Sequence, residues 1–283
     1  MKDVFLCHVY TFVDEKTYEE IKKSDFLKNE FCHCEEKTHS AGDGATWTGF
    51  YLTGENTYIE FFNHKDRDYL LTVDCGGSNA IAFSIDNPKE FNELVENFKQ
   101  KFLANNIRSG LIEKNIDNNL INWFYYLFLI KDFSMMPELD SWVMTYHQDY
   151  PKKVGRNQPE KEDIITRKYY NKECNAVPYD ESKLFKDIEE ITLWLNDDNK
   201  VKFVNQLNLF GYTCEEVDNC VICRGSDVVI NIKSSSDDKS EHLILCMSLN
   251  REVNGAQIYN IGNSKLELKD KTAVWKFAKI SEN

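Results

Sequence analysis

The sequence has no apolar run long enough to cross a membrane. A helix needs about 20 consecutive apolar residues to span a bilayer, and the longest candidate, residues 120–130, is shorter and contains Asn122. The first residues do not read as a signal peptide, because Asp3 and His8 interrupt the apolar segment that secretion requires. The sequence therefore predicts no membrane partner and a cytoplasmic location.

Positive charge is also scarce. The 283 residues include 34 Lys and Arg against 47 Asp and Glu, which gives a formal net charge of −13. Binding to phosphates needs clustered Lys and Arg, and no basic stripe occurs along the chain. We therefore expect no nucleic-acid partner, while the composition leaves the oligomeric state open.

Proline and glycine are few, with five and twelve residues, so the chain is not dominated by linkers. At roughly 150 residues per domain, the length predicts about two domains. Residues 151–162 are polar and carry two Pro and one Gly, which is typical of a linker. We expect a domain over residues 1–150, a linker or extension over 151–185, and a C-terminal unit over 186–283.

The nine cysteines are an odd number, and without a secretion signal we expect reduced thiols. Cys32-His33-Cys34, with His39 nearby, resembles a metal knuckle. An extended strand, however, points His33 away from its two neighbours. The single CxxC at residues 220–223 lacks a second pair and is weak evidence for zinc or for redox chemistry. Both motifs are more typical of buried thiols.

The order of the predicted elements repeats along the chain. Residues 4–63 read as a strand, a helix over residues 15–30 and three further strands, the first of them beginning at Phe31. Residues 79–147 repeat this order, and a third unit begins with a strand at residues 188–195 and a helix after Asn196. The repeat predicts an α+β fold of βαβββ modules, with an additional C-terminal α+β unit.

Two polar residues lie in apolar strands of the first unit, His8 near its start and Glu60 near its end. A carboxylate in an apolar strand needs a partner. The pair has three interpretations: ligands of a divalent metal, a general base with its carboxylate, or a structural pair. When the first two units are superposed on the ends of their first strands, Val13-Asp14 and Ile85-Asp86, Ala80 falls opposite His8. Matching their last strands puts Met144 roughly opposite Glu60.

Aromatic residues are numerous on the same strands. They either line a pocket for a flat or apolar small molecule, or belong to the core. His147, at the end of a strand of the second unit, is either a third ligand beside His8 and Glu60 or a solvent-exposed histidine. The aromatic set consists of Trp47, Phe50, Tyr51, Tyr58, Phe62, Trp123 and Trp142.

His8 near the start of its strand, Glu60 in TYIEFF and the restart FSIDNPKEF resemble the glyoxalase-like, or vicinal oxygen chelate, superfamily. The motifs WTGFYLTGENTYIEFF, SWVMTYH and GNSKL are similar to those of an uncharacterised bacterial branch of it. The resemblance covers residues 1–150 as a module pair and 186–280 as a half-like unit. It implies cupped half-barrel sheets that enclose a pocket. It also implies a divalent metal held by the first and last strands of both modules. Module one offers His8 and Glu60, whereas Ala80 and Met144 cannot ligate a hard cation.

The resulting hypothesis is a protein that binds a small molecule in the pocket of the first two modules, either as an enzyme or as a binding protein. His8 and Glu60 are the candidate catalytic residues and the candidate ligands of a divalent metal. The alternative is a non-catalytic protein that sequesters a metabolite, drug or signalling molecule, or that contacts a protein partner. The candidate ligand-binding residues are Trp47, Tyr51, Tyr58, Trp142 and His147.

Overall fold

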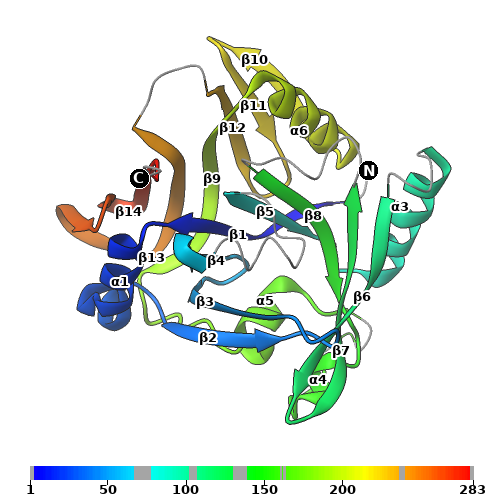
Figure 1. The fold of residues 1–283 in the computed structure, drawn as a ribbon. Helices are drawn as coiled ribbons and strands as arrows, with labels where there is room; N and C mark the ends of the chain where they lie inside the picture. The colour runs from blue at the N-terminus through cyan, green and yellow to red at the C-terminus, as the bar shows by residue number, and fades with distance from the viewer. Residues whose placement is uncertain are drawn as a thin grey trace.

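The computed structural model describes residues 3–66, 78–101, 107–129, 139–159, 161, 164–235 and 240–280, and its strands form two sheets (Figure 1). None of the helices in these ranges is long and apolar enough to cross a membrane.

The first βαβββ module occupies residues 5–63. It comprises β1 (Phe5–Val13), α1 (Glu15–Lys23), the π-helical turn η1 (Leu27–Phe31), β2 (Cys34–Ser40), β3 (Thr46–Thr53) and β4 (Tyr58–Asn63), and the 3-10 turn η2 (His64–Asp66) follows it. Asp14 caps α1 by accepting a hydrogen bond from the backbone N–H of Thr17. The helix predicted over residues 15–30 is interrupted at Ser24, which is extended, and η1 then includes Phe31, so the next strand begins at Cys34 instead of Phe31.

The second module repeats this order. It comprises β5 (Asn79–Ser84), α3 (Pro88–Lys101), β6 (Ile107–Ile116), β7 (Asn119–Leu129) and β8 (Leu139–Tyr146). Pro88 is the first residue of α3, where its missing N–H costs no hydrogen bond. Asp117 and Asn118, with φ of 51° and 65°, form the two-residue turn between β6 and β7. Asp and Asn tolerate positive φ, which this kind of hairpin turn requires.

The two modules form one eight-stranded sheet in the order β2-β3-β4-β1-β5-β8-β7-β6. In each module the first strand is parallel to the last, and β1 joins β5 in antiparallel fashion at the centre. A bridge joins Ala41, just after the edge strand β2, to Lys114 in the other edge strand, β6, so the sheet is strongly curled. The predicted α+β fold with repeated modules and a cupped sheet is confirmed.

The third unit follows a segment that contains α4 (Tyr150–Lys153), α5 (Arg167–Tyr169) and the π-helical turn η4 (Tyr170–Cys174). It comprises β9 (Phe185–Leu195), α6 (Asp197–Leu209), β10 (Thr213–Val217), β11 (Cys220–Arg224), β12 (Val229–Ser234), β13 (Glu241–Ile261) and β14 (Ser264–Ala278). Its sheet has the order β10-β11-β12-β9-β13-β14, with β9 parallel to β12. The first five elements form a third βαβββ module, and β13 pairs with β9 as β5 pairs with β1.

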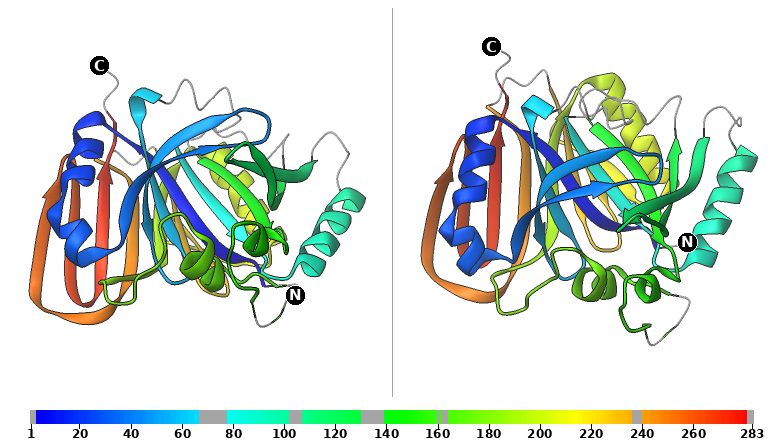
Figure 2. Two further views of the ribbon diagram at one scale, coloured as in Figure 1. Left: turned by 90° about the horizontal axis from the view of Figure 1, so that it is seen from below. Right: turned by 60° about the horizontal axis from the view of Figure 1, so that its bottom comes forward.

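The third unit covers the outer face of the curled sheet. Phe61 of β4 packs on Trp275 of β14 with ring centroids 5.2 Å apart, and Phe83 of β5 packs on Phe210, just after α6, at 5.4 Å. Helix α1 lies across the β13–β14 hairpin (Figure 2), where the Glu20 carboxylate accepts a hydrogen bond from the backbone N–H of Gly262. The outer face is therefore core, and the inner face is left for a cavity.

The cysteines depart in part from the expectation of reduced thiols, because a disulfide joins Cys214 of β10 to Cys223 of β11. These residues face each other across the antiparallel pair of β10 and β11. The sequence pattern did not predict strand β10 and so could not predict this contact. Cys32 and Cys34 are free and buried. The ring of His33 contacts the carbonyl of Pro178, so the three residues do not form a metal knuckle.

Arg167 is a buried charge that joins all three units. Its guanidinium donates to the Leu6 carbonyl at 2.5 Å and to the Asp227 carboxylate at 2.5 Å, and its Nε lies 3.6 Å from Asp86. Only 7% of the residue's surface is exposed. Removing one partner of such a buried pair leaves the other charge uncompensated.

Replacing Arg167 with Met should lower the free energy of unfolding by about 3–5 kcal/mol, because Asp227 and Asp86 lose their cation. Chemical denaturation measures the change. The matched control is Arg156→Met, at an exposed arginine of the same segment, which should change stability by less than about 0.5 kcal/mol. An Arg167→Met protein as stable as the control would contradict this role.

Candidate functional site

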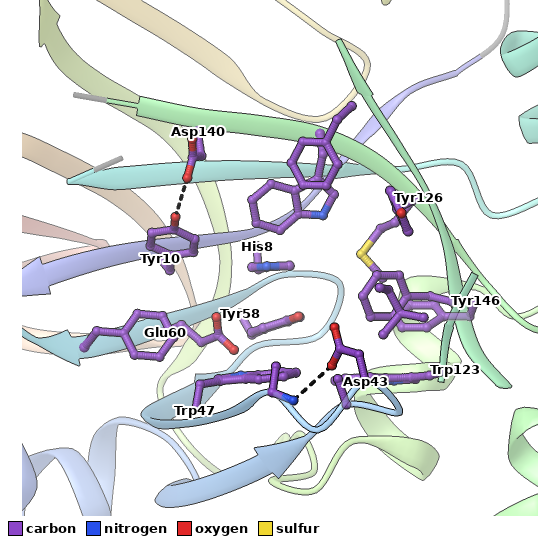
Figure 3. Close-up of a pocket in the computed structure, with 18 of the residues that line it drawn as sticks. His8, Tyr10, Asp43, Trp47, Tyr58, Glu60, Trp123, Tyr126, Asp140 and Tyr146 are labelled. Carbon is purple, nitrogen blue, oxygen red and sulfur yellow. Dashed lines mark hydrogen bonds between the residues drawn. The ribbon is translucent and has the colours of Figure 1, made fainter. Parts of the chain in front are cut away.

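A cavity of about 210 Å³ lies on the inner face of the eight-stranded sheet (Figure 3). A water molecule takes about 30 Å³ in the liquid, so the space suits a small molecule. Both modules and the β2–β3 loop contribute lining residues. The lining consists of His8, Tyr10, Phe12, Ala41, Asp43, Ala45, Trp47, Tyr58, Glu60, Phe62, Arg108, Ile112, Trp123, Phe124, Tyr126, Phe128, Asp140, Trp142, Met144 and Tyr146.

A bulge in β1 directs His8 into this cavity. Leu6 pairs with Phe83 and His8 with Ala82, so Cys7 is an extra residue in the ladder. Leu6 packs in the outer core, whereas Cys7 packs with the aromatic cluster of the inner side, its Sγ 3.6 Å from the hydroxyl of Tyr146. Beyond the bulge, strict alternation places His8, Tyr10 and Phe12 along the cavity.

His8 is held between aromatic rings. Its imidazole stacks on Tyr58 with centroids 4.3 Å apart and meets the edge of Trp142 at 5.5 Å. Its Nδ1 lies 3.4 Å from the Sγ of Cys7. Burial lowers the pKa of His8 to about 3, because the charged imidazolium is poorly solvated there. His8 is therefore neutral at physiological pH.

Glu60 is a buried carboxyl group in the same cavity, with 8% of its surface exposed. Burial raises its pKa to about 7, although its hydrogen bond with Tyr51 and the charge of Lys114 both act in the opposite direction. Lys114 is itself buried, which lowers its pKa to about 8, and its Nζ lies 4.3 Å from the ring centroid of Trp123. The charge of Glu60 acts in the opposite direction on the pKa of Lys114, as that of Lys114 does on the pKa of Glu60.

Tyr51 interacts with Glu60 from outside the cavity. Its hydroxyl accepts a hydrogen bond from the indole N–H of Trp47 at 3.2 Å and interacts with the Glu60 carboxyl. It is 3% exposed and does not line the cavity, which differs from the prediction that it contacts a ligand directly. A chain of side chains from Trp47 through Tyr51 therefore positions the carboxyl.

The structure brings most of the predicted site residues together. His8 and Glu60 line one cavity with Trp47, Tyr58 and Trp142. His147 does not join them: it lies just after β8, where its Nε2 is 3.2 Å from Asn122 and its Nδ1 accepts from the backbone N–H of Asp149. Both ring nitrogens are engaged there, and the ring is buried rather than solvent-exposed.

Several residues of the site escaped the sequence analysis. Asp140 is 3% exposed and accepts a hydrogen bond from Tyr10 at 2.9 Å. Asp43 and Arg108 are exposed and lie at the rim, and Lys114 lies behind Trp123. One signal was available, since Asp140 begins the apolar strand DSWVMTY and a carboxylate there needs a partner as much as Glu60 does.

The residues present do not fit the metal that the resemblance implies. In module one His8 pairs with Tyr58, and Glu60 lies two residues further along β4; in module two Ala80 pairs with Asp140, so Trp142 takes the place of Glu60. The equivalent position is thus two residues from Met144, and it still offers no ligand. Among the described residues, no three His, Cys, Asp or Glu side chains come together to hold a metal.

A family model matches residues 6–277, and the chain therefore belongs to the family of unknown function DUF5829. None of the curated proteins matches the chain.

Two solved structures are similar to this one. A hypothetical protein from Staphylococcus aureus is 9% identical and aligns over 93% of this chain and 98% of its own, with a TM-score of 0.54. A Bacillus subtilis protein described as a "putative dioxygenase" is 13% identical over 84% of this chain and 66% of its own, with a TM-score of 0.30. The first likeness extends to the fold alone.

The carboxyl group of Glu60 should titrate with a midpoint near pH 7. Carbon NMR of protein labelled at the glutamate carboxyl carbons measures this, and Glu60→Gln assigns the signal by removing it. Lys114→Met should raise the midpoint, since Glu60 loses a nearby positive charge. His8 and His39 stay neutral over this range, because burial lowers the pKa of each to about 3. A midpoint below about 5 would contradict the burial argument.

Proposed function

We propose that this member of the DUF5829 family binds a small organic molecule in the cavity of the eight-stranded sheet. The observation that carries the proposal is the buried carboxyl of Glu60 facing a cavity that is otherwise largely aromatic. Concave, mostly apolar sites with a few fixed polar groups are where proteins bind small molecules. Burying a carboxyl costs free energy that Tyr51 and Lys114 offset only in part, and a polar or charged group of a ligand would offset more of it.

The residues of the cavity favour ligand binding without a metal ion over metal-dependent catalysis. Glyoxalase-like proteins are expected to use ligands from both modules, and here one module supplies Ala80 and Trp142. Neither residue has a donor atom for a hard cation. We therefore propose that the cavity acts without a metal ion, as a binding or sequestering site.

A second candidate function is acid–base catalysis by Glu60. It is favoured by the near-neutral pKa of the carboxyl, which suits a group that both accepts and releases a proton at physiological pH. The neutral His8 ring would then orient the substrate. If a ligand is recovered chemically changed after incubation, the protein is an enzyme; recovery of unchanged ligand favours sequestration.

Filling the cavity should abolish small-molecule binding. We expect saturation-transfer NMR with a library of small organic fragments to give hits for the native protein that disappear in Ala45→Trp, because Ala45 lines the cavity. The matched control is Val201→Trp, at an exposed position on α6, which should keep the hits. Hits that survive in Ala45→Trp, or a native protein without hits, would refute the proposed site.

Divalent ions should bind neither His8 nor Glu60. Adding zinc, nickel or manganese is expected to change the melting temperature by less than about 1 °C, since a ligand stabilises only the state that it binds. The double variant His8→Ala and Glu60→Gln should respond in the same way. Stoichiometric metal in the purified protein that is lost in this variant would show that the metal-free proposal is wrong.

A further inference from the structure

The charged residues that line the cavity differ in depth, and the buried ones are acidic. Glu60 and Asp140 are buried in its walls, and Figure 3 shows them on opposite sides of His8. Asp43 adds a third carboxylate at the exposed rim. Arg108 is the one Lys or Arg among the lining residues, and it is exposed, with its guanidinium 5.9 Å from the ring centroid of Tyr126. The buried part of the lining therefore carries two carboxyl groups, and the buried cation that acts on Glu60, Lys114, lies outside the lining, over Trp123.

The remaining wall is built from aromatic rings. Aromatic faces carry partial negative charge and attract cations placed within about 6 Å, with Trp the strongest of them. The protein already uses this interaction at the back of the site, where Lys114 lies over Trp123. The aromatic lining residues are Tyr10, Phe12, Trp47, Tyr58, Phe62, Trp123, Phe124, Tyr126, Phe128, Trp142 and Tyr146.

We infer that the ligand is a small organic cation, an amine or quaternary ammonium group on an apolar or aromatic body. Aromatic rings accept both parts of such a molecule, and the Glu60 carboxylate neutralises its charge where water is excluded. An anionic ligand would place a further negative charge beside Glu60 and Asp140. This inference rests on the proposed function, and it adds the class of ligand.

The net charge of the protein also favours a cationic ligand. The formal net charge of −13 attracts cations over a distance of about a Debye length, and a cleft with low-dielectric walls concentrates that field. Arg108 at the rim reduces the attraction locally, but it is exposed and therefore screened by water.

Three probes with the same ring and similar size separate the possibilities: benzylamine, benzyl alcohol and benzoate, measured by calorimetry at pH 8. We expect benzylamine to bind at least about tenfold more tightly than either analogue. Glu60→Gln should weaken benzylamine about tenfold and change benzyl alcohol by less than about twofold. Glu189→Gln, at an exposed glutamate of β9, is the matched control and should change neither.

Each outcome bears on a different claim. Equal or tighter binding of benzoate or benzyl alcohol would overturn the choice of a cation while leaving small-molecule binding intact. If none of the three probes binds, the charge class of the hits in the fragment library decides: cations support the inference, and neutral or anionic hits overturn it. A library without any hit would overturn both this inference and the proposed function.

Discussion

The antiparallel pairing of β1 with β5 is the contact on which the rest of the site depends. It joins two modules whose first and last strands are parallel, and so builds one curled sheet instead of two small ones. It also sets the register that carries Tyr10 beside Ala80 and His8 beside Ala82. The small residues of β5 pack against the large residues of β1, and His8 and Tyr10 line the cavity.

Burial of charge follows from this geometry. A carboxyl on β4 at position 60 must face the inside of the sheet, because side chains alternate along a strand. There it loses water, and Tyr51 and Lys114 only partly compensate. The result is a group with a raised pKa beside open space. Sites that combine these two properties are where ligand binding is most often found.

Much of the architecture could be predicted from the repeat. The repeated strand–helix–strand order predicted the modules, and the unusual place of His8 and Glu60 in apolar strands predicted two residues that line one cavity. The sequence could not predict how the strands pair in three dimensions. Three features depend on that pairing: the bulge at Cys7, the Cys214–Cys223 disulfide and the position of His147. Strand β10 was also missed, although the Asp218-Asn219 turn after it repeats the Asp117-Asn118 turn of module two.

The central claim is that the aromatic, acidic cavity takes up an organic cation. A crystal structure of the protein with benzylamine tests it most directly. The account predicts that the amine lies within hydrogen-bonding distance of the Glu60 carboxylate and over an aromatic ring, with the benzyl group inside the cavity. Benzylamine bound with its amine turned to solvent beside Arg108, or bound outside the cavity altogether, would contradict it.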